Sequence, residues 1–214
     1  MSVVSTSSTG PAHTPRGTRA LIIMLVSLCL YTFADLASKE WALDSLSRAR
    51  AGQPPPVCQP DDQGYARMQR LPQRNVTLIE NYLEFRYAEN CGAAFGMLRT
   101  APSWLRALIF GVASIGACIV LTVMFVRGVG GRMFAWSVPL VLSGAIGNFT
   151  DRVRHGFVVD FIRFHIRNNW EYPTFNVADI AIAVGVGFLL LDGLKKQAPR
   201  RELVADETSS ADRG

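Results

Sequence analysis

The chain has 214 residues, enough for one domain or two small ones, but its composition does not suit an ordinary soluble domain. Charged residues make up 18% against about 25% in typical globular domains, and the mean hydropathy is +0.19. The net charge of +5 comes mainly from scattered arginines that border apolar runs, which favours a lipid partner over nucleic acid. Four cysteines without CxxC spacing and three separate histidines exclude a zinc module, and the composition excludes a disulfide scaffold and a disordered chain.

Both ends of the chain are expected to lie outside the folded part. Residues 1–18 are rich in Ser, Thr, Gly and Pro, which predicts a disordered cytoplasmic tail. Residues 195–214 are charged and predict a second cytoplasmic tail. The apolar stretch that follows the first tail is long and lacks a small-residue cleavage site, so it is not an obvious secretory signal. Residues 19–194 are expected to form the membrane domain.

Four hydrophobic runs lie between the tails, at residues 20–37, 104–126, 133–149 and 175–194. At about 1.5 Å per residue, the second run is long enough to cross a hydrocarbon core of about 30 Å. The third run is shorter and contains Pro139. Strands of a closed barrel would alternate apolar and polar residues instead of giving continuous runs. The sequence therefore predicts a mainly α membrane protein with four transmembrane helices.

The segment between the first two predicted helices is expected to lie outside the cytoplasm. Basic residues in the short loop 127–132 and after residue 194 favour cytoplasmic termini, although the expected outer regions also carry arginines. Residues 44–74 are rich in Pro, Gln and Arg, which predicts an irregular extracytoplasmic insertion. Residues 75–99 alternate apolar and polar side chains, which predicts two or three short strands on the membrane surface.

Three aspartates lie at or near predicted helix ends on the outer side: Asp35, Asp160 and Asp179. An ionisable residue in an apolar run costs several kcal/mol unless it is paired or faces water. One such aspartate alone is more often a helix cap, but three at one depth, beside Asn148, Arg152 and Asn176, indicate a polar site. Asp192, near the cytoplasmic end, is expected to be a solvated charge.

Two neighbouring carboxyl groups in a partly desolvated pocket share one proton, so one can activate water while the other polarises a carbonyl group. This is the chemistry of aspartic proteases. The sequence contains no GxSxG, HExxH or GxGD motif. Two other classes stay open: a small transporter or channel with proton- or cation-binding carboxylates, and a non-catalytic membrane anchor. The absence of internal repeats and the position of the carboxylates near one surface favour hydrolysis.

Five segments of the chain resemble the lipoprotein signal peptidase (signal peptidase II) family, bacterial inner-membrane aspartic proteases that cut signal peptides from lipidated prolipoproteins. In chain order they are Asp35-Leu-Ala-Ser-Lys39, Asn90-Cys-Gly-Ala-Ala-Phe-Gly96, Gly147-Asn148-Phe-Thr-Asp151-Arg152, Gly156-Phe-Val-Val-Asp160-Phe161 and Phe175-Asn176-Val-Ala-Asp179. A single segment would be a weak signal, whereas five in the family's order form a specific one.

The resemblance implies that Asp160 and Asp179 are the catalytic pair. It implies substrate-binding or supporting roles for seven further residues: Asn90, Gly92, Asn148, Arg152, Asn176, Asp35 and Lys39. The family fold is four transmembrane helices with a small extracytoplasmic β-cradle, which fits residues 75–99. A short amphipathic helix also belongs to that fold, and the sequence does not show where it lies.

The substrate implied by the resemblance is a signal peptide anchored by a diacylglyceryl-modified cysteine and cleaved on the amino side of that cysteine. The expected site faces the outer side of the bacterial inner (cytoplasmic) membrane, with membrane lipid as a second partner. No cofactor, metal or nucleic acid is expected, and the expected state is a monomer. The insertion at 44–74 is longer than the family pattern, and its Cys58 lies on the same oxidising side as Cys91, so a Cys58–Cys91 disulfide is a hypothesis.

Overall fold

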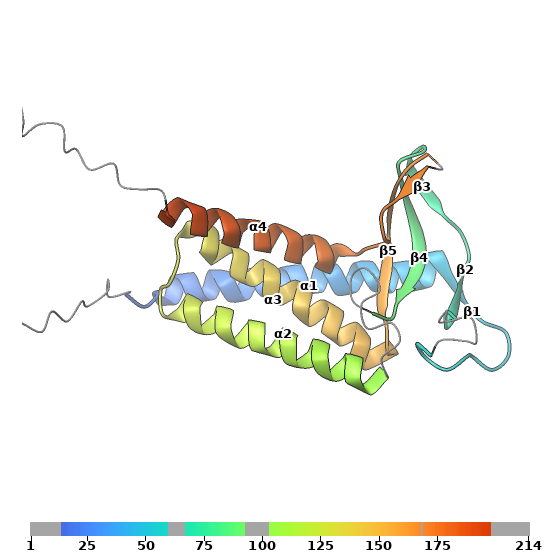
Figure 1. Cartoon of the computed structure of the whole chain (residues 1–214), viewed down its shortest axis with the longest axis horizontal. Helices are drawn as coiled ribbons and strands as arrows, with labels where there is room; N and C mark the ends of the chain where they lie inside the picture. The colour runs from blue at the N-terminus through green and yellow to red at the C-terminus, as the bar shows by residue number, and fades with distance from the viewer. Residues whose placement is uncertain (1–13, 60–66, 93–102, 168, 198–214) are drawn as a thin grey trace, which may run out of the picture.

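The computed structural model describes residues 14–59, 67–92, 103–167 and 169–197. Its elements, in chain order, are α1 (Thr18–Leu46), β1 (Ser47–Ala49), β2 (Arg70–Pro72), β3 (Val76–Ile79), β4 (Leu83–Asn90), α2 (Ser103–Val126), α3 (Arg132–His155), β5 (Val158–Ile166), β6 (Trp170–Glu171) and α4 (Val177–Gln197). The helices lie side by side, and the strands gather at one end of the bundle (Figure 1). Residues 1–13 and 198–214 of the predicted tails, 60–66 of the insertion and 93–99 of the predicted cradle lie outside the described residues.

Within the described residues, the helices α1, α3 and α4 are long and apolar enough to cross a membrane. The helix α2 contributes a shorter apolar stretch, Gly111–Val126. Large apolar side chains point away from the bundle, and Phe33, Val112 and Leu190 are 72%, 63% and 64% exposed. Such side chains suit a hydrocarbon solvent, and the helical backbone bonds its own polar groups there. The mainly helical prediction is confirmed.

The helices α1 and α3 extend well beyond the apolar runs that predicted them. α1 continues past the expected end at residue 37 to Leu46, and α3 continues past residue 149 to His155. Gly156 ends α3 in the left-handed conformation, with φ 82°, and its amide donates to the carbonyl of Arg152. The added turns carry polar side chains that pair with one another, so hydropathy did not mark them.

The structure describes the chain from residue 14 onward, and α1 begins at Thr18, inside the segment that was expected to be disordered. The guanidinium of Arg16 donates to the carbonyl oxygens of Val129 and Gly130 at 3.1 and 3.2 Å, and it lies 4.8 Å from the centre of the Phe125 ring. Arg16 therefore fastens the start of α1 to the loop between α2 and α3. At the other end, α4 continues to Gln197, past the expected boundary at residue 195.

The helix α3 packs against α1, α2 and α4 and forms the centre of the bundle. Glycines allow a close approach between α3 and α4. A Cβ atom at Gly144 would lie 2.4 Å from the carbonyl oxygen of Ala178, and one at Gly185 would lie 2.6 Å from Val141 Cγ2. Small residues commonly serve this purpose in membrane helices. The close packing brings the beginning of α4 against the polar second half of α3.

The strands β3-β4-β5-β6 form an antiparallel sheet in that order. Its first two strands come from the predicted cradle, whereas β5 follows α3 directly, in a region for which the sequence predicted no strand. The register pairs Ala88 with Asp160 and Asn90 with Val158. Residues 44–74 are not wholly irregular, because the end of α1 and the antiparallel pair of β1 and β2 lie within them. The pairing of β4 with β5 carries Asn90 to the strand that holds Asp160.

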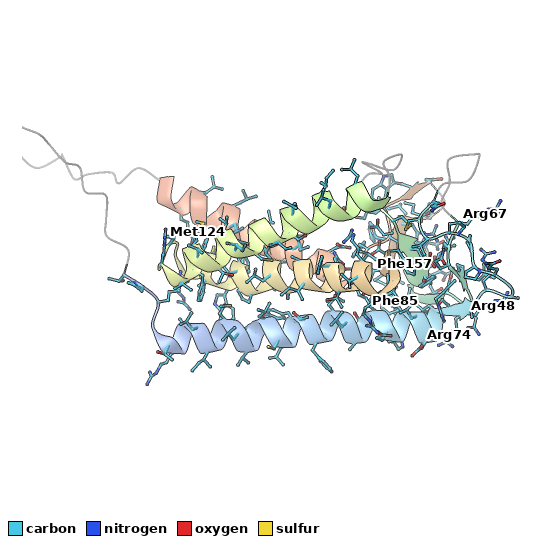
Figure 2. The ribbon with its side chains drawn as sticks, turned by 90° about the horizontal axis from the view of Figure 1, so that it is seen from below. Arg48, Arg67, Arg74, Phe85, Met124 and Phe157 are labelled. Atoms are coloured by element: carbon cyan, nitrogen blue, oxygen red, sulfur yellow. A yellow bond between two sulfur atoms is a disulfide. The ribbon has the colours of Figure 1, made fainter. Side chains whose placement is uncertain are left out.

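Apolar side chains join the end of α1 to the sheet. Leu43, Leu46, Tyr87 and Val159 are buried together, and Phe85 stacks edge-on against Trp41 with ring centres 5.3 Å apart. Figure 2 shows Phe85 and Phe157 at this junction between the helices and the strands. Burial of several large side chains contributes on the order of 2 kcal/mol each, so the sheet is held firmly to the bundle.

A disulfide joins Cys58 of the insertion to Cys91, with 5.4 Å between the Cα atoms. The hypothesis of this pairing is confirmed. Among the described cysteines, Cys29 and Cys118 are free thiols.

Asp192 is not the solvated charge that the sequence suggested. It is 8% exposed, and its carboxylate accepts hydrogen bonds from the backbone amides of Gly131 at 3.0 Å and Phe134 at 3.3 Å. These amides belong to the first turn of α3, where helical partners are missing and the helix dipole favours a negative charge. A side chain of α4 therefore caps α3.

We expect Asp192→Ala to lower the free energy of unfolding by about 1–2 kcal/mol, because two amides lose their acceptor. Asp192→Asn should lose less, since its amide oxygen still accepts a hydrogen bond. Thermal unfolding in detergent measures both changes. An Ala variant as stable as the parent would contradict the cap.

Candidate functional site

The three aspartates that the sequence grouped come together at the sheet end of the bundle, each from a different element. Asp160 lies on β5 and Asp179 lies in the first turn of α4. Asp35 does not end its helix as expected, since α1 continues for three further turns. The convergence is therefore confirmed, but it joins the interior of one helix, a strand and the start of another helix rather than three helix ends.

Asn176 bridges the two carboxyl groups of Asp160 and Asp179. Its side-chain amide donates to Asp160 Oδ1 at 2.6 Å, and its backbone amide donates to Asp179 Oδ2 at 3.2 Å. The backbone amide of Asp179 donates in return to Asn176 Oδ1 at 3.0 Å. Asn176 directly precedes α4, so these bonds also cap the helix. The residue that starts the helix thus sets the relative position of the pair.

Asn148 of α3 connects Asp179 to Asn176 and Lys39. Its side-chain amide donates to Asp179 Oδ1 at 2.9 Å, and its Oδ1 accepts from Asn176 at 3.2 Å and from Lys39 Nζ at 2.8 Å. Since an ammonium group can only donate, Lys39 fixes which end of the Asn148 amide faces it. The amide NH₂ is thereby turned toward Asp179.

Lys39 is buried, with its side chain 2% exposed, and pairs with two carboxylates. Its Nζ lies 2.9 Å from Asp35 Oδ2 and 3.4 Å from Asp151 Oδ2. Asp35 also accepts the backbone amide of Ala178 at 2.8 Å, and Asp151 accepts that of Val159 at 3.0 Å. This buried ion group therefore fastens α1, α3, α4 and β5 to one another.

Asp151 belongs to one of the sequence motifs, but it was not predicted from the sequence as a site residue. It follows Asn148 by three residues, which places both side chains on one face of α3. That spacing was the available signal. Gly147 lies on the same helix, and a Cβ there would be 2.1 Å from Asp35 Oδ2, so only glycine leaves room for the ion group.

A pocket of about 220 Å³ opens beside the pair. The residues with polar side chains that line it are Asn90, Asn148, Arg152, Tyr172, Thr174 and Asp179. Asp179 is half-buried and faces the pocket, whereas Asp160 is only 2% exposed. Of the two carboxyl groups, Asp179 is thus the more open to water.

Arg152 and Gly92 extend the network to the pocket wall. The guanidinium of Arg152 donates to the carbonyl oxygens of Asn148 at 3.1 Å and Gly92 at 3.4 Å. The amide of Gly92 donates to Asn90 Oδ1 at 3.1 Å, and the Asn90 side chain also hydrogen-bonds the carboxyl group of Asp160. Every residue that the sequence nominated for the site therefore belongs to one connected network.

Burial first, and the neighbouring Asp179 carboxylate second, raise the pKa of Asp160 to about 7. Hydrogen bonds from Asn90 and Asn176 act in the opposite direction, because they stabilise the charged form. Near neutral pH, Asp160 therefore keeps its proton in a large fraction of molecules. The pair then holds one acidic proton beside one carboxylate that reaches water, which is the state needed for acid–base hydrolysis.

The described residues contain no group of three or more His, Cys, Asp or Glu side chains that could hold a metal ion. His155 stacks on Phe157, with ring centres 5.7 Å apart. His165 lies on β5, where its Nδ1 is 2.9 Å from the carbonyl oxygen of Arg167. Both histidines thus have structural contacts away from the carboxyl pair.

Comparison with known proteins gives consistent results. Residues 27–195 match the profile of the family described as signal peptidase (SPase) II. The chain is 33% identical over 172 residues to a lipoprotein signal peptidase of Yersinia enterocolitica, covering 80% of this chain and 86% of that protein. It is 39% identical over 134 residues to the lipoprotein signal peptidase of Yersinia pestis, covering 62% of this chain and 78% of that protein.

Two solved structures share the fold. Both are bacterial membrane enzymes determined by the in meso method, one at 2.3 Å and one at 1.9 Å resolution. The first superposes with a TM-score of 0.61 at 21% identity and covers 90% of this chain and 98% of the other. The second gives a TM-score of 0.58 at 22% identity and covers 86% and 99%.

We expect Lys39→Met to destabilise the protein by about 3–5 kcal/mol, because it leaves two buried carboxylates without their cation. The matched control is Glu40→Gln, which removes the neighbouring ion pair with Arg154. That pair is nearly half-exposed on both sides and should contribute less than about 1 kcal/mol. Denaturant or thermal unfolding in detergent compares the two, and equal effects would contradict the organising role of Lys39.

Proposed function

The chain belongs to the signal peptidase II family, and from that premise we propose that Asp160 and Asp179 form the dyad with which it cleaves diacylglyceryl-modified prolipoproteins. It is a bacterial membrane protease that removes signal peptides from lipoproteins. The observation that carries the proposed mechanism is the bridge that Asn176 makes between the two carboxyl groups.

In this mechanism, Asp179 is the general base and Asp160 is the general acid. Asp179 faces the pocket and takes a proton from a water molecule, whose oxygen attacks the scissile carbonyl carbon. Asp160, protonated because of its raised pKa, donates a hydrogen bond to the carbonyl oxygen as negative charge develops there. The proton held by Asp179 then passes to the leaving amine, and cleavage falls on the amino side of the lipidated cysteine.

The remaining polar residues of the pocket are proposed to hold the substrate main chain. Asn90, Gly92 and Arg152 form one wall, and their side chains and backbone offer both donors and acceptors to an extended peptide. Contacts with the main chain do not depend on substrate side chains, so signal peptides of many sequences can bind. Asn148, Asn176, Asp35 and Lys39 are proposed as positioning residues, since they act on the carboxyl pair through hydrogen bonds.

We also propose that the protein lies in the inner membrane with the site toward the outer face. The described parts of both termini lie at one end of the bundle and the sheet lies at the other (Figure 1). The Cys58–Cys91 disulfide supports an oxidising compartment for the sheet end. Since α1 and α4 each connect the sheet end with the end that holds the termini, both termini are then cytoplasmic. The proposed working unit is a monomer in contact with membrane lipid.

A transporter or a non-catalytic anchor would not need water-activating chemistry at this pair. We expect Asp160→Asn and Asp179→Asn each to lower kcat for a lipidated prolipoprotein by at least about 10³-fold, because each removes one partner of the acid–base pair. Cleavage by the parent should survive a metal chelator. The assay uses purified protein in detergent, with Glu40→Gln as a folded control that keeps activity. Activity retained in either Asn variant would show that the dyad is assigned wrongly.

The proposed acid must be protonated, so activity should fall as the pH rises through the pKa of Asp160. With that pKa at about 7, kcat/KM should be about tenfold lower at pH 8 than on the plateau at lower pH. A pH–rate profile measures this limb. A profile that stays flat from pH 6 to about 9 would contradict the assignment of Asp160 as the acid.

Protein stability provides an independent check of the same titration. The folded pKa of Asp160 lies above the unfolded value of about 3.9, so the folded state binds more protons between these two pH values. The contribution of Asp160 to the stability of the parent should therefore fall as the pH rises from about 4 to about 7. Asp160→Asn removes this contribution. The free energy of unfolding of the variant minus that of the parent should therefore be larger at pH 8 than at pH 5.

A further inference from the structure

The disulfide attaches the insertion to the strand end that carries pocket residues. Cys91 stands between Asn90, which hydrogen-bonds Asp160, and Gly92, whose carbonyl oxygen accepts from Arg152. The paired register of β4 with β5 ends at Asn90. Strand ends beyond the last pair open most readily, so Gly92 depends on contacts other than the sheet. Among the contacts that hold the chain beyond Asn90, the disulfide between Cys58 and Cys91 is covalent.

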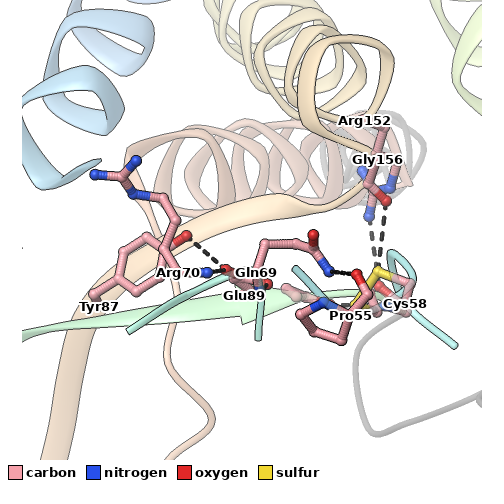
Figure 3. Close-up of a disulfide and its surroundings, with 11 residues drawn as sticks. Pro55, Cys58, Gln69, Arg70, Tyr87, Glu89, Arg152 and Gly156 are labelled. Carbon is pink, nitrogen blue, oxygen red and sulfur yellow. Dashed lines mark hydrogen bonds between the residues drawn. A yellow bond between two sulfur atoms is a disulfide. The ribbon is translucent and has the colours of Figure 1, made fainter. Parts of the chain in front are cut away.

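Hydrogen bonds fasten the insertion to β4 at a second point. The carboxylate of Glu89 accepts the backbone amides of Gln69 at 2.7 Å and Arg70 at 2.8 Å, and it also accepts the hydroxyl of Tyr87 at 2.9 Å. The Gln69 side chain donates to the carbonyl oxygen of Pro55 at 2.8 Å, which connects the two described parts of the insertion. Figure 3 shows these bonds beside the disulfide.

The insertion also contacts the end of α3 next to Arg152. A Cβ at Gly156 would lie 2.7 Å from Val57 Cγ1, so Val57 packs directly on the turn that ends α3. In Figure 3, the Arg152 side chain points toward the Cys58 sulfur. Cys58 is 4% exposed in this position. The insertion thus touches both sides of the Arg152–Gly92 contact that borders the pocket.

From these contacts we propose that the Cys58–Cys91 disulfide is a positioning element of the active site. It clamps the insertion against Asn90, Gly92 and Arg152, and its reduction lowers proteolytic activity in a reversible way. This inference rests on the proposed function. The clamp acts through two contacts: Asn90 orients Asp160, and Gly92 holds Arg152 where the substrate main chain is proposed to bind.

The chemical step is a two-electron thiol–disulfide exchange. A dithiol such as dithiothreitol attacks one sulfur, the bond between Cys58 and Cys91 breaks, and both cysteines end as thiols. The two electrons and two protons come from the reductant, which closes to a cyclic disulfide. An oxidised dithiol or glutathione disulfide reverses the exchange and restores the bond.

Steady-state cleavage of a diacylglyceryl-modified prolipoprotein, measured well below the unfolding temperature of the reduced protein, tests the proposal. We expect reduction to lower kcat/KM at least tenfold, with kcat falling and KM rising, and reoxidation to restore both. Cys58→Ser/Cys91→Ser should show the kinetics of the reduced parent and no response to dithiothreitol. Cys29→Ala/Cys118→Ala is the matched control and should respond like the parent. Parental kinetics in the Cys58→Ser/Cys91→Ser variant, or in a parent shown by thiol counting to be reduced, would overturn the clamp.

Hydrogen–deuterium exchange provides a readout that does not depend on catalysis. Reduction should speed exchange in a peptide covering residues 83–92, whose Gly92 amide is bonded to Asn90, and leave a peptide within α4 unchanged. Equal exchange of residues 83–92 in both redox states would reject the positioning role. If the oxidised parent does not cleave the lipidated substrate, the proposed function fails, whereas the exchange result still decides the clamp. Reduction of the native parent also covers the case in which the Ser variant does not fold.

Discussion

The buried ammonium group of Lys39 is the constraint on which the rest of this structure depends. A charge removed from water is tolerated only with oppositely charged partners and a full set of hydrogen bonds. Here the partners are Asp35 and Asp151, and each of these also accepts a backbone amide from a different element, Ala178 of α4 or Val159 of β5. Satisfying one cation therefore fixes where four elements meet. The same cation turns the Asn148 amide, which sets the orientation of Asp179.

The aspartates of this fold serve three purposes, because their surroundings differ. Asp35 and Asp151 contact an ammonium group directly, so their charges are compensated and structural. Asp192 meets amides at a helix start and stabilises that start. Asp160 is buried beside another carboxylate, and both effects raise its pKa to about 7. Burial beside a second carboxylate thus falls on the residue whose proton the proposed reaction uses.

The sequence predicts those parts of the structure that depend on a pattern of neighbouring residues in the chain. Apolar runs predict the helices, and the short polar motifs predict that Asp35, Asp160 and Asp179 share one site. The polar last turns of α1 and α3 carry no such pattern, because the contacts of Lys39 with Asn148 and Asp151 join two helices that are distant in the chain. The cap by Asp192 was missed for the same reason, since its partners lie about sixty positions away on another helix. The β1–β2 pair joins residues on either side of a long loop, and local composition does not reveal such a pairing.

The two sides of the pocket are held by different kinds of bond, and the local dielectric explains the choice. Where the pair is buried, an ion pair is strong because little water screens it, so Lys39 holds Asn148, which in turn contacts Asp179. Where water reaches the pair, as for the half-exposed Arg154 and Glu40, the ion pair is weak. A wall that must stay in place there needs interactions that water does not weaken. The covalent Cys58–Cys91 bond and the amides gathered by Glu89 provide them, which is why the insertion belongs to the architecture of the site.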